Sequence, residues 1–152
     1  MKIRNFLFLH CIIMTDAHKE IITPEVEVSL YKYIKQIARK HKCKILEIGG
    51  TENHVHFILH PNPDLSLDET LKRLKHYTQF KISKTVPDFY WAEGYYVYSI
   101  SMEDIENESI AILEEKNKHK TLSLDEELKK LREDLEMNAT DSVLSVNETR
   151  LN

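Results

Sequence analysis

The chain has 152 residues, of which 41% are hydrophobic and 30% are charged, and its formal net charge is −4. This length predicts one domain, and the apolar fraction is enough for a buried core. With 3 Gly and 4 Pro, a loop-rich or disordered chain is excluded. Cys11 and Cys43 lack a Cys-x-x-Cys spacing, which argues against a disulfide framework or a structural zinc site. No segment approaches the roughly 18 apolar residues of a membrane span, so we expect a cytoplasmic protein with no membrane partner.

Charge is distributed unevenly along the chain. Residues 1–100 carry 14 Lys/Arg and 11 Asp/Glu, a net of +3, whereas residues 101–152 carry 7 and 14, a net of −7. A polyanion would therefore be attracted to the first part of the chain, and the acidic C-terminal part contributes little to such attraction.

The N-terminal part predicts a strand, a helix and two further strands. Residues 6–14 form an apolar run that is typical of a strand buried on both faces. Thr23-Pro24 marks a helix start, with proline at the first helical position and apolar residues at helical spacing after it. Residues 43–48 predict a second strand. Residues 54–60 predict a third, which a Pro-Asn-Pro sequence ends because proline cannot continue a strand ladder.

A second helix and a fourth strand complete this pattern. Ser66, with Glu69 three residues later, forms a capping box that marks a helix start. Residues 95–101, which are rich in tyrosine, predict the fourth strand. The order β-α-β-β-α-β predicts an α+β, ferredoxin-like fold, in which an antiparallel four-stranded sheet has two helices on one face. The first and third strands would be central.

Additional helices are predicted towards the C-terminus. Ser101 opens a third helix, which we expect to run to about residue 120, and Ser123 opens a fourth. The fourth helix carries a narrow seam formed by Leu124, Leu128, Leu131 and Leu135. This seam packs on the sheet, on the third helix or on a second subunit. We expect one domain over residues 1–137, with its C-terminal helices from about residue 102, and a flexible tail over residues 138–152.

Two histidines are predicted to lie side by side on one face of the third strand. Val55, Phe57 and Leu59 alternate towards a core, so His54 and His56 point to the opposite face. Residues two apart on a strand lie roughly 6.5–7 Å apart, and imidazoles at that spacing can converge on one divalent ion. The pair is either a metal site or two ordinary strand histidines, because a His-x-His spacing alone does not decide between them.

The helix that follows Ser66 carries a run of basic side chains. Between residues 72 and 84 there is almost no acidic residue to balance them, although surface helices usually interleave the two signs. The run is either a solvated helix face or a surface that contacts phosphate groups. Its candidate contact residues are Lys72, Arg73, Lys75, His76, Lys81 and Lys84.

Four segments, in their order and spacing, resemble the single-tyrosine transposases of the HUH endonuclease superfamily, the small insertion-sequence and REP-associated transposases. The segments are IGGTENHVHF at 48–57, LSL at 65–67, FYWAEGY at 89–95 and YSIS at 98–101. The resemblance extends over about residues 6–128.

This resemblance implies metal-dependent chemistry on DNA. His54, His56 and a polar residue of a later helix would hold Mg²⁺ or Mn²⁺, which polarises the scissile phosphate of single-stranded DNA. A tyrosine of that helix would attack and form a 5′-phosphotyrosine, so that strands are nicked and rejoined during DNA transposition without ATP. The resemblance also implies that the protein is a homodimer and that its partner is single-stranded or hairpin DNA.

The sequence departs from the family's pattern at the nucleophile. Counting from Ser99-Ile100-Ser101, the family's tyrosine falls at Ala111 and its glutamine at Glu115, while His119 matches a histidine near the end of that helix. Glu115 is a competent ligand for a hard cation, so the implied metal ligands are His54, His56 and Glu115. Ala111 cannot be a nucleophile, and no tyrosine follows position 98.

Three explanations for this departure compete. The protein is a natural derivative retained for DNA binding, or a copy whose nucleophile has been substituted, or another tyrosine, such as Tyr95, Tyr96 or Tyr98, attacks the DNA. Whether the chain is an enzyme therefore stays open. A ferredoxin-like RNA-binding module, whose aromatic residues stack on bases, is a further alternative, although the open face of the histidine strand lacks aromatic residues.

Overall fold

The structure is a computed structural model and describes residues 4–139. Its strands and helices are β1 (Phe8–Met14), α1 (Pro24–Lys40), β2 (Lys44–Gly50), β3 (His54–His60), α2 (Leu67–Ile82), β4 (Tyr96–Ile100), α3 (Ile105–Leu113), α4 (Glu115–Lys118) and α5 (Leu124–Ala139). The chain divides into two compact units, residues 1–116 and residues 117–152, and the sheet belongs to the first unit together with α1, α2 and α3.

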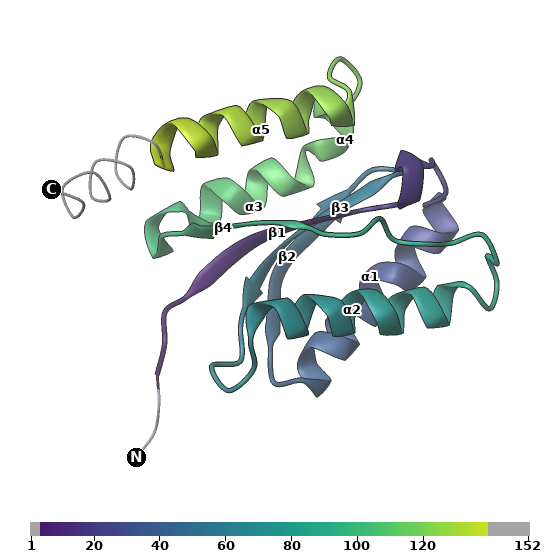
Figure 1. Cartoon of the computed structure of the whole chain (residues 1–152), viewed down its shortest axis with the longest axis horizontal. Coiled ribbons are helices and arrows are strands. Elements are labelled where there is room, and N and C mark those ends of the chain that lie inside the picture. The colour runs from purple at the N-terminus through teal and green to yellow at the C-terminus, as the bar shows by residue number, and fades with distance from the viewer. Residues whose placement is uncertain (1–3, 140–152) are drawn as a thin grey trace, which may run out of the picture. The chain divides into compact units, whose positions relative to one another are not determined.

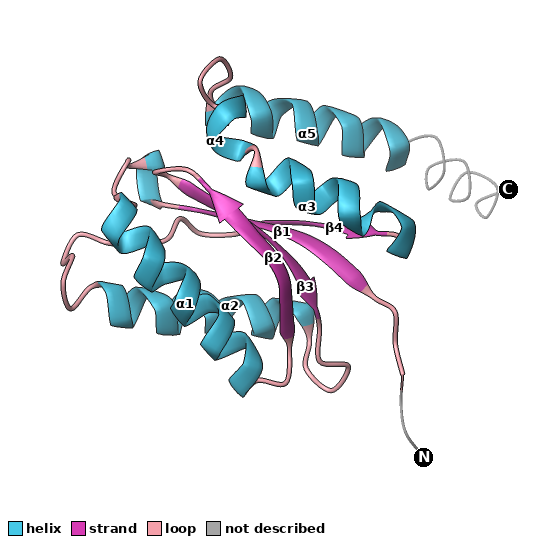
Figure 2. Ribbon diagram, turned by 180° about the vertical axis from the view of Figure 1, so that it is seen from behind, coloured by secondary structure: helices cyan, strands magenta, loops and turns pink. Residues whose placement is uncertain are grey.

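One antiparallel sheet organises the first unit. Its strand order is β2-β3-β1-β4, so β1 and β3 are central. Helices α1 and α2 cover one face of the sheet (Figure 1), and α3 lies on the other face, as the view from behind also shows (Figure 2). The predicted α+β, ferredoxin-like arrangement with further C-terminal helices is confirmed.

The main core lies between the sheet and the layer formed by α1 and α2. On the central strands, Cys11 is paired with Phe57 and Ile13 with Val55, and these four side chains are buried. The inner faces of the two helices complete this core with Leu30, Ile34, Ile37, Leu71, Leu74 and Ile82. Because side chains alternate along a strand, the intervening residues of β1 and β3 point to the face that carries α3.

The starts of α1 and α2 agree with the capping signals in the sequence. The hydroxyl of Thr23 accepts a hydrogen bond from the Val26 N–H at 3.3 Å, and Pro24 occupies the first helical position. The hydroxyl of Ser66 accepts from the Glu69 N–H at 3.1 Å. None of the helices that the structure describes is both long and apolar enough to cross a membrane.

The third predicted helix is not continuous, so this prediction was wrong. A 3₁₀ turn at Met102–Asp104 comes first, α3 then ends at Leu113, and α4 starts two residues later. Glu114 separates them with φ −90° and ψ 2°, which leaves the α-helical region, although its N–H still bonds to the Ile110 carbonyl at 3.1 Å. The break therefore falls directly before Glu115, the residue that approaches the histidine strand.

A glycine on β2 allows α3 to approach the sheet closely. An added Cβ at Gly49 would lie 2.6 Å from the carbonyl oxygen of Ile112 and 2.9 Å from its Cγ2. Ile112 is the buried residue of α3, whereas Ile110 and Leu113 are exposed. The helix backbone thus rests on the sheet at a position where any side chain would hold it away.

The second unit contains α5, whose start agrees with the predicted cap. The hydroxyl of Ser123 accepts a hydrogen bond from the Glu126 N–H at 3.1 Å. The helix carries the predicted leucine seam and continues to Ala139. The rest of the segment predicted to be a flexible tail, residues 140–152, lies outside the described residues.

Gly49→Ala tests the close approach of α3. The added methyl group overpacks the contact with a backbone oxygen, so we expect the free energy of unfolding to fall by about 1–3 kcal/mol. Chemical denaturation measures this change. An unchanged free energy of unfolding in Gly49→Ala would contradict the role of Gly49 as a spacer.

Candidate metal centre

Three residues from two separate parts of the chain meet on the α3 face of the sheet. His54 and His56 project from β3, and Glu115 is the first residue of α4. The Nε2 atom of His54 lies 3.4 Å from Glu115 Oε2, and the Nε2 atom of His56 lies 3.4 Å from Glu115 Oε1. All three side chains are buried, with Glu115 only 3% exposed. The structure thus brings together the three residues that the sequence predicted as metal ligands.

The second ring nitrogen of His54 is held by neighbouring polar groups. Its Nδ1 lies 2.9 Å from the Asn53 side-chain oxygen and 2.9 Å from the Thr51 hydroxyl, which itself donates to that oxygen at 3.1 Å. An amide oxygen can only accept, so His54 carries its proton on Nδ1 when neutral. The lone pair on Nε2 then points towards Glu115.

The second ring nitrogen of His56 contacts another histidine, which the sequence reasoning missed. His56 Nδ1 lies 2.7 Å from His10 Nε2, and His10 Nδ1 lies 2.7 Å from Glu108 Oε2. The Tyr98 hydroxyl lies 2.9 Å from His10 Nδ1 and donates to Glu108 Oε2 at 3.1 Å. Burial, together with the neighbouring His56, lowers the pKa of His10, although Glu108 opposes this shift.

The donor set fits a divalent cation. Two imidazole nitrogens and a carboxylate face one another inside the protein at 3.4 Å, a distance longer than a good hydrogen bond. A buried carboxylate is costly unless a cation or proton compensates its charge. Imidazole and carboxylate are both ligands of first-row divalent metals, and a hard cation such as Mg²⁺ or Mn²⁺ takes carboxylate oxygen.

The predicted phosphate-contacting residues lie on α2, apart from Lys84 in the turn that follows Ile82. This helix covers the opposite face of the sheet from the three candidate ligands. Lys72 pairs with Asp68 at 2.8 Å and Arg73 pairs with Glu69 at 2.9 Å, so the acidic partners stand one turn before the basic run. Such exposed pairs contribute little to stability and exchange readily with other anions.

Lys75 differs from its neighbours on α2 in its hydrogen bonds. Its ammonium group donates to the carbonyl oxygens of Ala92 and Gly94 at 2.6 and 2.8 Å. Partial burial lowers the pKa of Lys75. This lysine therefore fixes the loop before β4, and a phosphate would have to displace two carbonyl contacts to reach it.

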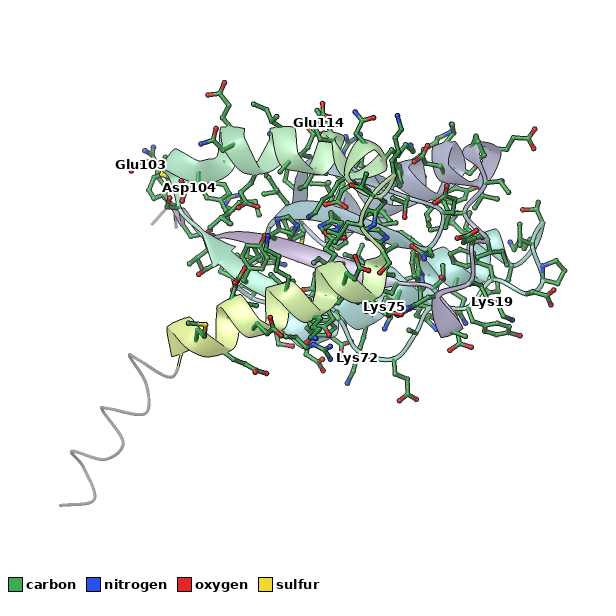
Figure 3. All side chains as sticks on the ribbon, turned by 90° about the horizontal axis from the view of Figure 1, so that it is seen from above. Lys19, Lys72, Lys75, Glu103, Asp104 and Glu114 are labelled. Atoms are coloured by element: carbon green, nitrogen blue, oxygen red, sulfur yellow. The ribbon has the colours of Figure 1, made fainter. Side chains whose placement is uncertain are left out.

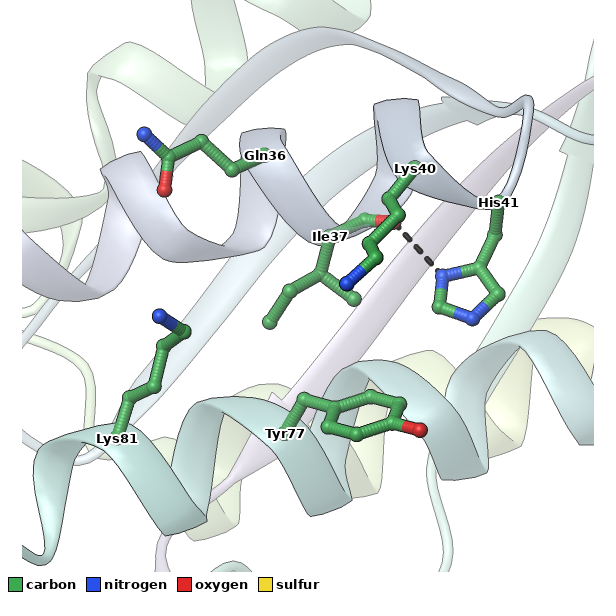
Figure 4. Close-up of a pocket in the computed structure, with 6 residues that line it drawn as sticks. All are labelled: Gln36, Ile37, Lys40, His41, Tyr77 and Lys81. Atoms are coloured by element: carbon green, nitrogen blue, oxygen red, sulfur yellow. Dashed lines mark hydrogen bonds between the residues drawn. The ribbon is translucent and has the colours of Figure 1, made fainter.

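A groove between α1 and α2 extends the basic surface (Figure 4). It has a volume of about 250 Å³ and is lined by Gln36, Ile37, Lys40, His41, Tyr77 and Lys81. The His41 Nδ1–H donates to the Ile37 carbonyl at 2.8 Å, and its ring stacks near Tyr77 with centroids 6.0 Å apart. No acidic residue occurs in residues 28–46 or 70–87. The groove therefore joins positive charge to an aromatic ring that is 45% exposed.

The position aligned to the family's nucleophile is exposed on α3. Ala111 stands four residues before Glu115, and its methyl group offers no reactive atom. Two of the alternative tyrosines are engaged elsewhere: Tyr95 donates to Asp68 at 2.8 Å, and the His10 ring separates Tyr98 from His56. Neither hydroxyl is directed at the three candidate ligands.

The remaining residue that the sequence matched to the family belongs to the second unit. The His119 Nδ1–H donates to the Leu122 carbonyl at 2.7 Å, and its Nε2 contacts the carboxylate of Glu127. Lys118 also pairs with Glu127, at 2.9 Å. His119 thus ties α5 to the segment that precedes it.

A comparison with models of known protein families identifies the family of this chain. Residues 5–114 match the family described as transposase IS200 like, so the chain belongs to the IS200-like transposases. A comparison with curated proteins gave no match.

Two solved structures share the fold. One is a protein from Deinococcus radiodurans that was assigned as a transposase, with 20% identity and a TM-score of 0.61 over 74% of this chain and 95% of that one. The other is a REP-associated tyrosine transposase bound to a REP hairpin, with 14% identity and a TM-score of 0.58 over 78% of this chain and 74% of that one.

Proposed function

We propose that this member of the IS200-like transposase family binds single-stranded or hairpin DNA together with a divalent cation held by His54, His56 and Glu115. The observation that carries the proposal is the convergence of two imidazole Nε2 atoms on the two oxygens of one buried carboxylate. Each oxygen faces a different histidine, so all three side chains offer a ligand atom to one shared space.

The proposed cation is Mg²⁺ or Mn²⁺. When bound, it would polarise a phosphodiester of the DNA and fix its geometry. The protein's own contribution is to bury the ligands and to orient them. Thr51 and Asn53 orient the ring of His54 through contacts with its Nδ1 atom. The helix break at Glu114 comes directly before Glu115, which approaches the histidines.

Replacing both histidines tests the cation site. We expect His54→Ala with His56→Ala to abolish Mn²⁺ binding in isothermal titration calorimetry, because two of three protein ligands are lost. Glu115→Gln should weaken binding less, since an amide oxygen still ligates. The matched control is His76→Ala with His41→Ala on the helix layer. Unchanged Mn²⁺ affinity after loss of the histidine pair would refute the site.

The DNA surface that we propose is the outer face of α1 and α2. Residues 28–46 and 70–87 carry 6 and 5 Lys/Arg with no acidic residue, whereas residues 101–116, which include α3, carry 6 Asp/Glu and one Lys. Figure 3 labels Lys72 on α2 and Glu103, Asp104 and Glu114 around α3. Phosphates are attracted to the helix layer and repelled by the segment around α3.

In this proposal the helix layer on one face of the sheet binds the DNA, and the other face binds the cation. A DNA hairpin bound on α1 and α2 would send a single-stranded flank around a sheet edge to reach the candidate ligands. Tyr77, beside Lys81 in the groove, offers a ring on which an unpaired base can stack. A solved relative of the same fold is bound to a REP hairpin, which supports hairpin DNA as the ligand class.

Neutralising two lysines at the end of α2 tests this surface. We expect Lys81→Gln with Lys84→Gln to weaken hairpin binding and to reduce the slope of log K against log salt by about 1–2, since each lost phosphate contact removes roughly one counterion. Fluorescence anisotropy at several salt concentrations measures both. Lys129→Gln with Lys130→Gln, an equal charge change on α5, is the control. The same slope in the unmodified protein and both variants would mean that Lys81 and Lys84 face solvent and do not contact the DNA.

We propose that the chain binds DNA without forming the family's covalent intermediate, because position 111 is alanine. Nicking by another tyrosine is the second candidate. For Tyr95 and Tyr98 it is disfavoured because their hydroxyls contact Asp68 and Glu108, respectively.

Ala111→Tyr should create the missing nucleophile. With Mn²⁺ and single-stranded hairpin oligonucleotides, we expect a covalent protein–DNA adduct on a denaturing gel from this variant. The unmodified protein and Ala111→Phe, which supplies the ring without the hydroxyl, should form none. An adduct from the unmodified protein would overturn the proposal that it binds without cleaving.

We further propose a homodimer, which the family resemblance implies. Ile110 and Leu113 on α3 are 54% and 62% exposed and lie one turn apart, so they form an apolar pair on the surface of the helix.

A charge on this apolar pair should disrupt the dimer. We expect Ile110→Lys with Leu113→Lys to sediment as a monomer where the unmodified protein sediments as a dimer. Val28→Lys, at an exposed apolar position on α1, is the control and should leave the dimer intact. A dimer that persists in the α3 variant would place the subunit interface elsewhere.

A further inference from the structure

A line of three side chains runs from α3 to the candidate ligand His56. Glu108 Oε2 lies 2.7 Å from His10 Nδ1, and His10 Nε2 lies 2.7 Å from His56 Nδ1. His10 is 4% exposed and stands on β1 beside the histidine strand. Both distances are short for hydrogen bonds between nitrogen and these acceptors, and the intervening ring is shielded from water.

The chemistry of the groups fixes where each proton lies. An ionised carboxylate can only accept, so His10 donates to Glu108 from Nδ1. A His10 ring whose single proton lies on Nδ1 has a lone pair on Nε2 and accepts there from His56, which then carries its own proton on Nδ1. The lone pair of His56 is left on Nε2, the atom that faces Glu115.

We propose that Glu108 and His10 are positioning residues that hold His56 in the one tautomer able to bind a cation through Nε2. This inference rests on the proposed function, because it assigns His56 as a metal ligand. A carboxylate or other acceptor behind a ligating histidine orients the ring and raises its basicity. Here the acceptor is a second histidine, and the carboxylate stands one residue further back.

The α3–α4 segment that supplies the ligand Glu115 also supplies this support. Glu108, Ile112 and Glu115 are spaced i, i+4 and i+7, so they share one side of the α3–α4 segment. Ile112 rests on Gly49 between the two carboxylates. The packing of this one segment on the sheet therefore positions two carboxylates. Glu115 would ligate the cation, and Glu108 would determine the tautomer of the histidine.

The competing interpretation is that Glu108 serves packing alone. Tyr98 also donates to Glu108, so the cluster would hold α3 on the sheet whether or not His56 were oriented. A stability measurement does not separate the two roles. The tautomer of His56 does, since packing alone does not specify which ring nitrogen carries the proton.

Two measurements on the same proteins test the proposal. Two-bond ¹H–¹⁵N correlation spectra of the metal-free protein near pH 7.5 should show His10 and His56 as Nδ1–H tautomers. In Glu108→Ala we expect His56 to gain the Nε2–H form, and the Mn²⁺ affinity from calorimetry to fall by about 10–100-fold. Glu108→Gln, whose amide oxygen can still accept from His10, should retain most of both properties and guards against misfolding of the alanine variant.

Glu106→Ala is the matched control, since it removes an exposed carboxylate from the same helix. The positioning role would be overturned by an Nε2–H tautomer of His56 in the unmodified protein, or by an unchanged tautomer and affinity in Glu108→Ala. If the unmodified protein binds no Mn²⁺, the proposed function fails and with it the metal role of His56. The spectra of the metal-free protein would then still decide whether Glu108 and His10 fix the ring.

Discussion

The close approach of α3 to the sheet is the constraint on which the candidate site depends. At Gly49 the helix backbone occupies the space that a side chain would fill, with the Ile112 carbonyl 2.6 Å from the position of an added Cβ. Because the helix lies this near, Glu108 reaches His10 and Glu115 reaches His54 and His56. These contacts place carboxylates and imidazoles where water is excluded, and such groups are stable there only when they compensate one another or a bound cation. The packing of α3 against the sheet is therefore what brings the charged and polar groups of the site together.

The sheet separates two chemical environments within the first unit. On one face, α1 and α2 present positive charge and the exposed ring of Tyr77, which suit a nucleic-acid backbone and an unpaired base. On the other face, the acidic segment around α3 encloses imidazoles and carboxylates, which suit a cation. Under the proposed function, the positive face would attract the DNA backbone and the acidic face would bind the cation. The sheet lies between these two oppositely charged surfaces.

The order of the elements was predictable from the sequence because its signals are local. The cap at Ser66, the proline at the start of α1 and the alternation along β3 each depend on residues a few positions apart. The pairing of His54 with His56 follows in the same way, since two residues on one strand define a face. The family resemblance then pointed to Glu115, which the structure places beside both histidines.

The support behind these residues was not predictable, because its contacts join distant parts of the chain. His10 is 46 positions from His56 and 98 from Glu108. The pairing of β1 with β3 makes the two histidines neighbours, and the packing of α3 on the sheet adds Glu108. Apolar residue type also does not predict burial on α3. Ile110 and Leu113 are exposed, whereas Glu108 and Glu115 contact histidines of the sheet.

The run of basic residues on α2 also predicted a phosphate contact at Lys75, which makes other contacts in the structure. Lys75 stood among the candidate phosphate contacts, yet its ammonium group holds two carbonyl oxygens of the loop before β4. Residue type and spacing identify a charged helix, but they do not say which charges are already engaged inside the protein.

The central claim is that α3 docks on the sheet so that one carboxylate and two histidines form a cation site. Anomalous diffraction at the manganese absorption edge, from crystals grown with Mn²⁺, tests it most directly. The account predicts one strong peak within bonding distance of the Nε2 atoms of His54 and His56 and of a Glu115 oxygen. A peak bonded to other residues, or an undocked α3 with the histidines apart from Glu115, would contradict it.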